Sequence, residues 1–530
     1  MGDVAGLLRA AVPFAEWERA RAPAVDAVVV QGDFRPALVA PGSGVDPREF
    51  ARELGSAMGK AGLYSRAGGV WWHDTKAGCL QPMSATRLPF WMLEEVKLVV
   101  ETKAAGAQLA VLSADMAARL LVAPTFMNAL PEVARVSPVP LPVERAGKVG
   151  LLPRGYSQDV KTMVLGDVEW TEMSSEEGVR VLTEKWLGEF PWDGRTGDSR
   201  RRSMAVAVAG MLAPFCELLV PAFQQRPAFC FTANREGSGK TLLARLCLCP
   251  IHGPVKITPP PEKRNEGSLR QLLSAVARAG EPYLFFDNWR GVIASPALEA
   301  FVTANIWGDR VLGVSELFTA EKSCLVFVTG NDAEVSPDIR RRSLFVELFI
   351  EEVRAEERVI RRRIDEDDII AGRGEILSAL WAIVRGWYGA GRPRGSVEHG
   401  SFAKWGSVVG AMVEWAMGIS PMGAADLRKG DADLAAFEEL VGLIMPADGP
   451  ERVEMSFADL LEAARAVEGF GWADAGEDDK EGAMKAERTN RGRFAAMAKR
   501  FVDSKFGGVR VKQTHSANRS RRMFVFTRAR

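Results

Sequence analysis

A glycine-rich segment between two apolar runs is the clearest chemical signal in the chain. Residues 234–241 read Asn-Arg-Glu-Gly-Ser-Gly-Lys-Thr and follow the apolar residues 227–233. An apolar strand, a loop of this kind and a helix, in that order, are typical of a phosphate-binding P-loop. Gly237 and Gly239 allow backbone amides to surround phosphate oxygens, and a helix that begins near Lys240 adds the positive end of its dipole. The segment therefore predicts a nucleotide-binding site.

The other residues of this loop define the predicted ligands. Lys240 is expected to bind the β- and γ-phosphates, and Thr241 is expected to ligate Mg²⁺. Ser238 lies between the two glycines and belongs to the same phosphate-binding loop. Asn234 stands where the motif has its first glycine, and we expect it to be tolerated because asparagine adopts left-handed backbone conformations more readily than other non-glycine residues. The predicted cofactors are ATP and Mg²⁺.

A second apolar run, residues 283–286, ends in Asp287 and Asn288. A carboxylate in this position holds the magnesium ion of P-loop ATPases. We therefore predict that Asp287 holds the ion through water or through Thr241. Asn288 stands where many ATPases have a glutamate, and an amide can orient a water molecule but cannot accept its proton. Either Asn288 positions the attacking water or an acid elsewhere takes the proton.

A third apolar run, residues 324–329, is followed by Gly330 and Asn331, and an arginine cluster comes soon after it. Asn331 is predicted to hydrogen-bond the attacking water or the γ-phosphate. Arg341 or Arg342 is predicted to reach across a subunit boundary and neutralise the charge that develops during hydrolysis. The alternative for the arginines is an exposed, solvated face.

The elements around these residues predict an α/β protein of several domains. Between about residues 196 and 390, apolar helices and strands alternate, which predicts a parallel α/β core. Residues 1–195 are predicted to form an α+β domain with a DNA- or partner-binding role, and residues 391–450 a helical connector. The expected helices outside the core are residues 46–61, 92–103, 401–417 and 431–445, and the expected N-terminal strands are 69–73 and 161–165.

Composition excludes several classes of protein. The 530 residues are 47% hydrophobic and 26% charged, which rules out collagen-like and disordered chains. The 68 basic and 68 acidic residues cancel, so no global field attracts nucleic acid. Six cysteines without CxxC pairs predict free thiols in a reducing cytoplasm and no metal beyond a nucleotide-bound ion. Residues 204–223 are apolar but contain Glu217 and two prolines, so they predict a buried helix and no membrane partner.

The C-terminal residues 451–530 carry a local basic surface. A helix over residues 491–506, two strands over 509–514 and 522–527, and the loop between these strands predict a winged helix. Its basic residues oppose a single acidic residue after position 490, and they predict salt-sensitive phosphate contacts with duplex DNA. The predicted DNA-binding residues of this domain are Arg491, Arg493, Lys499, Lys512, Arg519, Arg521 and Arg522.

In chain order, the segments GSGKT, FFDN, VTGN and DIRRRSL resemble those of AAA+ helicases of the superfamily 3 and minichromosome-maintenance type. The resemblance is strongest to replicative helicases of bacterial mobile elements such as chromosome cassettes and phage-like islands, and it extends to residues 155–157, 401–405 and 408–410. It implies an AAA+ ATPase domain in a hexameric ring, with ATP between subunits and single-stranded DNA in the pore.

Such rings also carry a β-hairpin with a basic tip before the third strand. In this chain Ser315 and Glu316 lie near the expected turn, so Arg310 and Lys322 are the candidates for the DNA contact. The implied function is an ATP-dependent DNA helicase that replicates a mobile genetic element. The alternative is a non-translocating AAA+ ATPase that acts as a switch, loader or initiator on DNA or a partner protein, which Asn288 favours.

Overall fold

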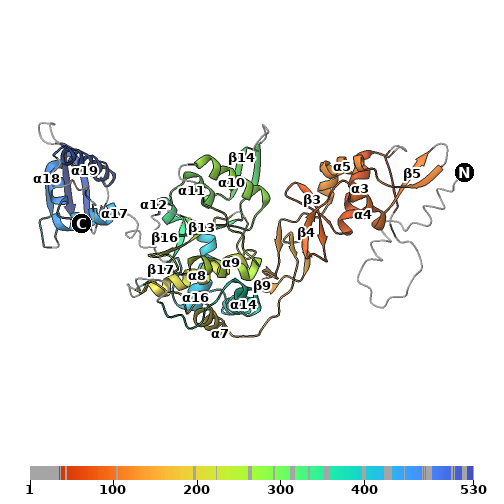
Figure 1. Cartoon of the computed structure of the whole chain (residues 1–530), viewed down its shortest axis with the longest axis horizontal. Coiled ribbons are helices and arrows are strands. Elements are labelled where there is room, and N and C mark those ends of the chain that lie inside the picture. Colours follow the sequence, from red (N-terminus) through yellow and green to blue (C-terminus); the bar gives the residue numbers. More distant parts are fainter. Residues whose placement is uncertain are drawn as a thin grey trace. The chain divides into compact units, whose positions relative to one another are not determined.

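The computed structural model describes most of the chain in two compact units (Figure 1). One unit contains residues 1–291, 295–333 and 342–423, and the other contains residues 424–530 with 292–294 and 334–341. The described residues are 35, 37–41, 45–102, 106–194, 198–222, 224–260, 265–289, 293–310, 317–331, 335–350, 358–396, 402–422, 432–446, 448–467, 470, 472, 480–502, 505–506, 508–515 and 522–528.

A parallel sheet forms the centre of the first unit. Its strands are β12 (Ala228–Ala233), β13 (Tyr283–Trp289), β16 (Leu325–Asn331) and β17 (Ser343–Leu348). They run parallel in the order β13-β16-β12-β17, so β16 separates β12 from β13. Most of their residues are buried, as expected where helices cover both faces of a parallel sheet. The prediction of an α/β fold with a parallel sheet is confirmed.

Buried helices pack against this sheet. The helix α8 (Ser199–Phe215) contains much of the apolar segment 204–223 and packs against α9 (Lys240–His252) and β17. The prediction of a buried helix there is confirmed. Among the described residues, no helix is both long enough and apolar enough to cross a membrane. Further helices of this unit are α10 (Glu266–Ala279), α11 (Pro296–Thr303), α13 (Glu366–Ala371) and α14 (Arg373–Gly389).

The core around the sheet is larger than the predicted 196–390 domain. Leu182 and Trp186 from the preceding segment pack into it, and so do Trp405 and Met412 from the predicted connector. Residues 402–422 therefore contribute to the same hydrophobic core as the sheet. The contributing elements are α7 (Ser175–Arg180), the π-helical turn η1 (Val181–Trp186), α15 (Ala403–Trp405), the π-helical turn η4 (Gly406–Gly410) and α16 (Ala411–Met417).

The N-terminal part has a separate cluster of buried side chains, which includes Phe50, Leu88 and Phe126. Its elements are β1 (Ala37–Val39), α3 (Pro47–Lys60), β2 (Leu63–Arg66), β3 (Gly69–Asp74), β4 (Cys79–Pro82), α4 (Leu88–Glu95), β5 (Lys97–Thr102), β6 (Gly106–Ala110), α5 (Ala114–Val122) and α6 (Pro124–Ala129). Five short strands follow: β7 (Arg135–Ser137), β8 (Pro142–Arg145), β9 (Lys148–Leu151), β10 (Gly155–Ser157) and β11 (Thr162–Val164).

The predicted helix over residues 92–103 is wrong. The helix α4 ends at Glu95, and residues 97–102 form β5, which pairs with β1 and β6. The sequence Lys-Leu-Val-Val-Glu-Thr of β5 contains three β-branched residues, which lose side-chain freedom in a helix and fit a strand better. Hydrogen bonding to β1 on one side and to β6 on the other then stabilises residues 97–102 as a strand.

The described residues of 432–528, in the C-terminal unit, form three helices and an antiparallel sheet of order β18-β21-β20-β19. In chain order the elements are α17 (Ala432–Ile444), β18 (Arg452–Ser456), α18 (Phe457–Ala464), α19 (Lys480–Arg500), β19 (Lys505–Phe506), β20 (Val509–His515) and β21 (Arg522–Arg528). The helix α19 begins at Lys480, well before the predicted start at Arg491. Its first turns consist largely of Ala, Met, Lys and Glu, which are good helix formers.

Candidate nucleotide-binding site

The carboxyl edge of the parallel sheet brings the predicted site residues together. The strand β12 leads into the loop 234–239 and then into α9. Asp287 lies near the end of β13, and the end of β16 lies between these two strands because Asn331 pairs with Ala233. Gly237 and Gly239 have φ angles of 72° and 88°, which favour glycine. The loop therefore has the backbone conformations that a phosphate-binding turn requires.

Lys240 begins α9 with its ammonium inside the loop. The side chain is only 7% exposed, and Nζ donates hydrogen bonds to the carbonyl oxygen of Arg235 at 3.3 Å and to Oγ of Ser238 at 3.1 Å. A buried ammonium beside the first turn of a helix lies where phosphate oxygens bind in P-loops. The structure thus brings Lys240 and Ser238 into contact within the loop.

Asn234 has a different role from the expected one. Its backbone does not have a positive φ angle. Instead, the side-chain amide donates to the carbonyl oxygen of Ile350 at 2.9 Å, and the Ile350 N–H donates to Oδ1 of Asn234 at the same distance. This reciprocal pair ties the start of the loop to the chain that follows β17. The expectation of a left-handed backbone at Asn234 is therefore wrong. Asparagine suits this position because of the hydrogen bonds that its side chain makes.

Asp287 and Thr241, the two predicted magnesium ligands, are in direct contact. The Thr241 hydroxyl donates to Oδ1 of Asp287 at 2.7 Å, and the hydroxyl of Thr329 donates to the same oxygen at 2.6 Å. A carboxylate beside a hydroxyl oxygen fits Mg²⁺, which takes one or two protein oxygens and fills its remaining positions with phosphate and water. Thr329, a buried residue of β16, was not singled out from the sequence.

Asn288 occupies an irregular position at the end of β13. The register between β13 and β16 shifts between Phe286 and Trp289, and Asn288 has a φ angle of 59°. This left-handed conformation favours asparagine among the non-glycine residues. The Asn288 N–H donates to Oγ1 of Thr329 at 2.8 Å, while its side chain is exposed. The irregularity therefore turns the amide side chain of Asn288 toward solvent at the edge that carries Asp287.

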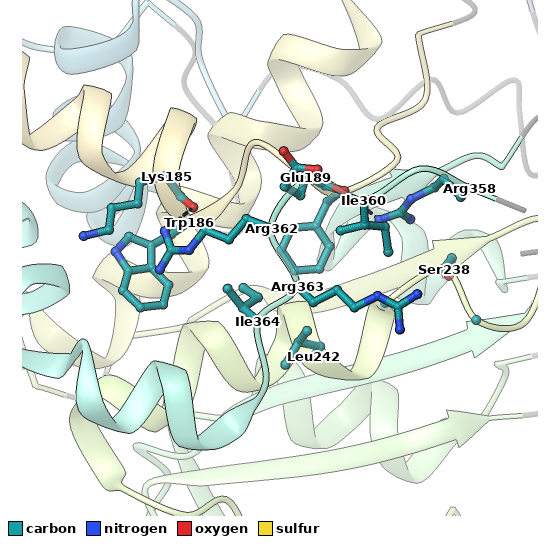
Figure 2. Close-up of a pocket in the computed structure, with 13 residues that line it drawn as sticks. Lys185, Trp186, Glu189, Ser238, Leu242, Arg358, Ile360, Arg362, Arg363 and Ile364 are labelled. Carbon is teal, nitrogen blue, oxygen red and sulfur yellow. Dashed lines mark hydrogen bonds between the residues drawn. The ribbon is translucent and has the colours of Figure 1, made fainter. Parts of the chain in front are cut away.

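A cavity of about 330 Å³ lies beside the loop. Gly237, Ser238 and Gly239 line it together with Trp186 and Phe190, two aromatic residues from the segment before α8 (Figure 2). A Cβ atom on Gly239 would meet Phe190 at 3.1 Å, so the ring lies directly against the loop. Sequence reasoning missed both aromatic residues, since nothing in residues 181–190 indicates that they fold back onto the loop.

Cations line another side of this cavity. Arg362 lies 5.2 Å from the ring of Trp186, and a guanidinium nitrogen of Arg358 donates to the carbonyl oxygen of Glu189 at 2.6 Å. Figure 2 shows Arg363 extending through the cavity toward Ser238. Aromatic surface beside arginines and backbone amides can bind a flat ring that carries an anionic group. This cavity therefore suits the base and phosphates of a nucleotide.

None of the catalytic candidates lines this cavity, which meets the loop at Gly237, Ser238 and Gly239. The backbone of Asn331 ends β16, but its side chain lies outside the described residues. Arg341 belongs to α12 (Pro337–Arg341), where its exposed side chain pairs with Asp338. The carbonyl oxygen of Arg342 accepts the backbone N–H of Ala228 at 3.0 Å. Arg342 thus precedes the amino end of β17, whereas the candidate site lies at the carboxyl edge of the sheet.

The expected hairpin is formed by β14 (Ile306–Arg310) and β15 (Leu317–Glu321) and projects from the body of its unit (Figure 1). Its tip, with Ser315 and Glu316, lies outside the described residues. Arg310 at the end of β14 is exposed. Asp309, next to Arg310 on β14, accepts hydrogen bonds from Ser274 at 2.6 Å and Arg270 at 3.1 Å, which fixes the hairpin to α10.

Lys322 does not fit the predicted DNA contact. It follows β15 at the base of the hairpin, is 3% exposed, and lies 5.3 Å from the ring of Phe301. Its ammonium donates to the carbonyl oxygen of Val302 at 3.4 Å. A side chain enclosed in this way cannot reach a DNA phosphate, so the prediction for Lys322 is wrong. The one-dimensional pattern showed a basic residue near the hairpin but not which way the residue faces.

The burial of Lys322 should make stability depend on pH. Burial lowers the pKa of Lys322 from 10.5 to about 8, because the charged form is poorly solvated. Between these values the unfolded chain holds a proton that the folded chain has released, so the free energy of unfolding rises with pH across this window. We expect Lys322→Met to raise the thermal unfolding midpoint by roughly 2–8 °C near neutral pH and by much less above the window. The same change at exposed Lys404 is the control, and identical pH profiles for wild type and Lys322→Met would contradict the account.

Two other predictions concern cysteines and the basic C-terminal residues. Cys247 and Cys249 are buried in the core, and burial lowers the pKa of His252 to about 4. The described part of the chain contains no cluster of His, Cys, Asp and Glu able to hold a metal ion. Of the basic candidates, Arg491, Arg493 and Lys512 are exposed on α19 and β20. The side chains of Lys499, Arg519, Arg521 and Arg522 lie outside the described residues.

Comparison with known proteins finds likeness among solved structures but no matching family. No protein-family model matches the chain, and neither does any curated protein. Among solved structures, the chain is similar to the apo A form of the C-terminal region of NrS-1, with a TM-score of 0.33 and 10% sequence identity. The similarity covers 72% of this chain and 79% of that structure. What this chain does must therefore follow from its own residues.

Proposed function

We propose that the chain is an ATP-dependent DNA helicase that assembles into a ring and unwinds DNA during replication of a mobile genetic element. The observation that carries this proposal is the contact of Thr241 with Asp287 at 2.7 Å, beside the buried ammonium of Lys240. These residues come from separate segments and meet at the edge of a parallel sheet where ligands usually bind. Their arrangement supports nucleotide hydrolysis.

Each residue of the site has a distinct part in this proposal. Lys240 and the loop amides bind the phosphates, and Thr241 with Asp287 would hold Mg²⁺, which neutralises charge on the phosphates. The exposed amide of Asn288 orients the attacking water. The cavity beside Trp186 and Phe190 holds the base. Because an amide cannot accept a proton, the water transfers its proton to another acceptor, which the mechanism of phosphoryl transfer permits late in the reaction.

The strand order supports an AAA+ core. The strand β16 lies between the P-loop strand β12 and the strand of Asp287, and Thr258 forms an additional parallel bridge to Phe286 beyond them. This arrangement agrees with the AAA+ resemblance of the motifs. The hairpin β14–β15 precedes β16 in the chain, where the resemblance implies a DNA-contacting hairpin. Arg310 is the described basic residue nearest its tip.

The element order of the C-terminal unit supports a winged helix. A helix, a strand, two helices and three strands follow one another as α17, β18, α18, α19, β19, β20 and β21, of which β19 has only two residues. The strand β21 pairs with both β18 and β20. In this arrangement α19 and the β20–β21 wing carry the exposed Arg491 and Lys512, which suits contact with duplex phosphates.

Strand separation is the direct test of this proposal. A forked duplex with a fluorophore and a quencher should be separated by the chain with ATP and Mg²⁺, and single-stranded DNA should stimulate ATP turnover. ATP turnover without stimulation or strand separation under any condition would instead support a non-translocating AAA+ switch, loader or initiator. The absence of ATP turnover would remove both alternatives.

The ring predicts complementation between defective subunits. If Arg341 or Arg342 acts in the neighbouring subunit, a chain with Lys240→Ala and a chain with an arginine-to-alanine change should regain ATPase activity when mixed. Some mixed interfaces then combine an intact P-loop with an intact arginine. Phosphate release measured across mixing ratios would show a maximum at intermediate ratios. No rescue at any ratio, with co-assembly shown by a tagged subunit, would exclude a shared site.

A further inference from the structure

We infer that Thr329 is the positioning residue that holds Asp287 and Asn288 in place for Mg²⁺-dependent hydrolysis, an inference that rests on the proposed ATPase function. Thr329 lies on β16 and is 1% exposed, so it does not contact solvent and has no direct access to a bulky ligand. Its hydroxyl is nevertheless shared between the two residues at the end of β13.

The geometry uses both functions of the hydroxyl. Thr329 Oγ1 donates its proton to Oδ1 of Asp287 at 2.6 Å and accepts the N–H of Asn288 at 2.8 Å. A hydroxyl has one proton and two acceptor positions, so a single side chain satisfies both partners. Thr241 donates to the same Oδ1 from the start of α9. The carboxylate of Asp287 is thus held by hydroxyls from two different elements.

This arrangement has a consequence for the metal site. Because Oδ1 of Asp287 accepts hydrogen bonds from two hydroxyls, the orientation of the carboxylate is fixed before Mg²⁺ binds. The position of its second oxygen, Oδ2, is fixed with it. A preorganised ligand binds its ion without the loss of side-chain freedom that an unrestrained carboxylate would incur. The hydroxyl of Thr329 should therefore strengthen metal-dependent steps more than nucleotide binding as such.

The same hydroxyl also supports the irregular backbone of Asn288. The N–H of Asn288 does not enter a regular ladder, because the register of β13 with β16 shifts between Phe286 and Trp289. Its bond to Thr329 supplies the missing acceptor and holds the φ angle of 59°. Removal of the hydroxyl would leave this N–H without its acceptor, and the exposed Asn288 side chain would lose its defined direction.

A neighbouring threonine provides a matched control. Thr232 lies on β12 of the same sheet, and its hydroxyl donates to the carbonyl oxygen of Val346 at 3.4 Å. Valine has nearly the same shape as threonine, so Thr232→Val removes one hydroxyl from the sheet. This hydroxyl bonds to the carbonyl oxygen of Val346 and not to Asp287. Comparison of the two variants therefore distinguishes the effect of losing any strand hydroxyl, in Thr232→Val, from the effect of losing the hydroxyl that contacts Asp287, in Thr329→Val.

The experiment compares full-length wild type, Thr329→Val, Thr329→Ser and Thr232→Val. ATP turnover is measured against Mg²⁺ concentration, and affinity for a fluorescent ATP analogue is measured both with Mg²⁺ and with EDTA. For Thr329→Val we expect the Mg²⁺ concentration at half-maximal rate to rise, and kcat to fall, by about 10- to 100-fold, because a hydrogen bond to a charged group is lost. Affinity in EDTA should stay unchanged, and both Thr329→Ser and Thr232→Val should resemble wild type.

Each outcome decides between the claims. Wild-type Mg²⁺ dependence in Thr329→Val would overturn the inference while leaving the proposed ATPase function intact. Equal losses in Thr329→Val and Thr232→Val would show a general effect on the sheet and would also overturn it. A wild type that binds no nucleotide would overturn the proposed function and the inference with it. If Thr329→Val does not fold, Thr329→Ala and Thr329→Ser supply the same test, since these two residues differ only by the hydroxyl.

Discussion

Replacement of Lys240 by alanine should lower ATP turnover by at least about 100- to 1,000-fold, the range seen when one preorganised charge-stabilising group is removed. The ammonium lies inside the glycine-rich loop against Ser238 and the Arg235 carbonyl, where under the proposed function it stabilises charge on the transferred phosphoryl group. Phosphate release under saturating ATP and Mg²⁺ is the measurement. Strand separation of a forked duplex should be lost in parallel.

The fold should survive this change. Lys240 is the first residue of α9, and alanine is an excellent helix former that leaves the apolar contacts of Leu243 and Leu246 in place. The thermal unfolding midpoint and circular dichroism spectrum check this point. Lys404→Ala removes an exposed lysine elsewhere in the same unit and should hydrolyse ATP like wild type. Hydrolysis by Lys240→Ala at the wild-type rate would refute the ATPase assignment.

Reversal of two exposed charges in the C-terminal unit, Arg491→Glu with Lys512→Glu, should weaken binding of duplex DNA by about 10- to 100-fold at ~100 mM salt. Each phosphate contact releases condensed counterions, so the slope of log affinity against log salt should flatten by roughly 0.9 for each lost contact. Fluorescence anisotropy of a labelled duplex over a salt series measures both quantities. ATP turnover should be retained, since neither residue belongs to the nucleotide site.

The control variant has the same change of net charge, but its substitutions lie outside the C-terminal unit. Lys148→Glu with Lys404→Glu reverses two exposed lysines outside the C-terminal unit and leaves Arg491 and Lys512 intact. If both double variants lose equal affinity, the effect comes from net charge and not from a winged-helix surface. An unchanged salt slope in the Arg491→Glu and Lys512→Glu chain would show that these side chains do not contact DNA phosphates.

Local chemistry was readable from the sequence because it depends on short segments. Glycines flanking Ser238 impose their backbone conformations within the loop itself, and the apolar runs before Asn234 and Asp287 alternate with helices in the pattern of a parallel α/β core. The same reasoning failed for residues 97–102. Their neighbours in the sequence continue a helical pattern, but strand partners elsewhere in the chain determine their conformation.

By itself, the sequence determined the position of the glycine-rich loop between a strand and a helix, the parallel α/β class and the residue types available for the predicted Mg²⁺. Only the tertiary structure decided that Asn234 pairs with Ile350, that Lys322 is enclosed, and that Trp186 and Phe190 reach the loop. It also decided that the hydroxyl of Thr329 holds Asp287. The physical reason is range: backbone preference and hydrophobic period act over a few residues, whereas burial and hydrogen-bond partners depend on segments far apart in the chain that packing brings together.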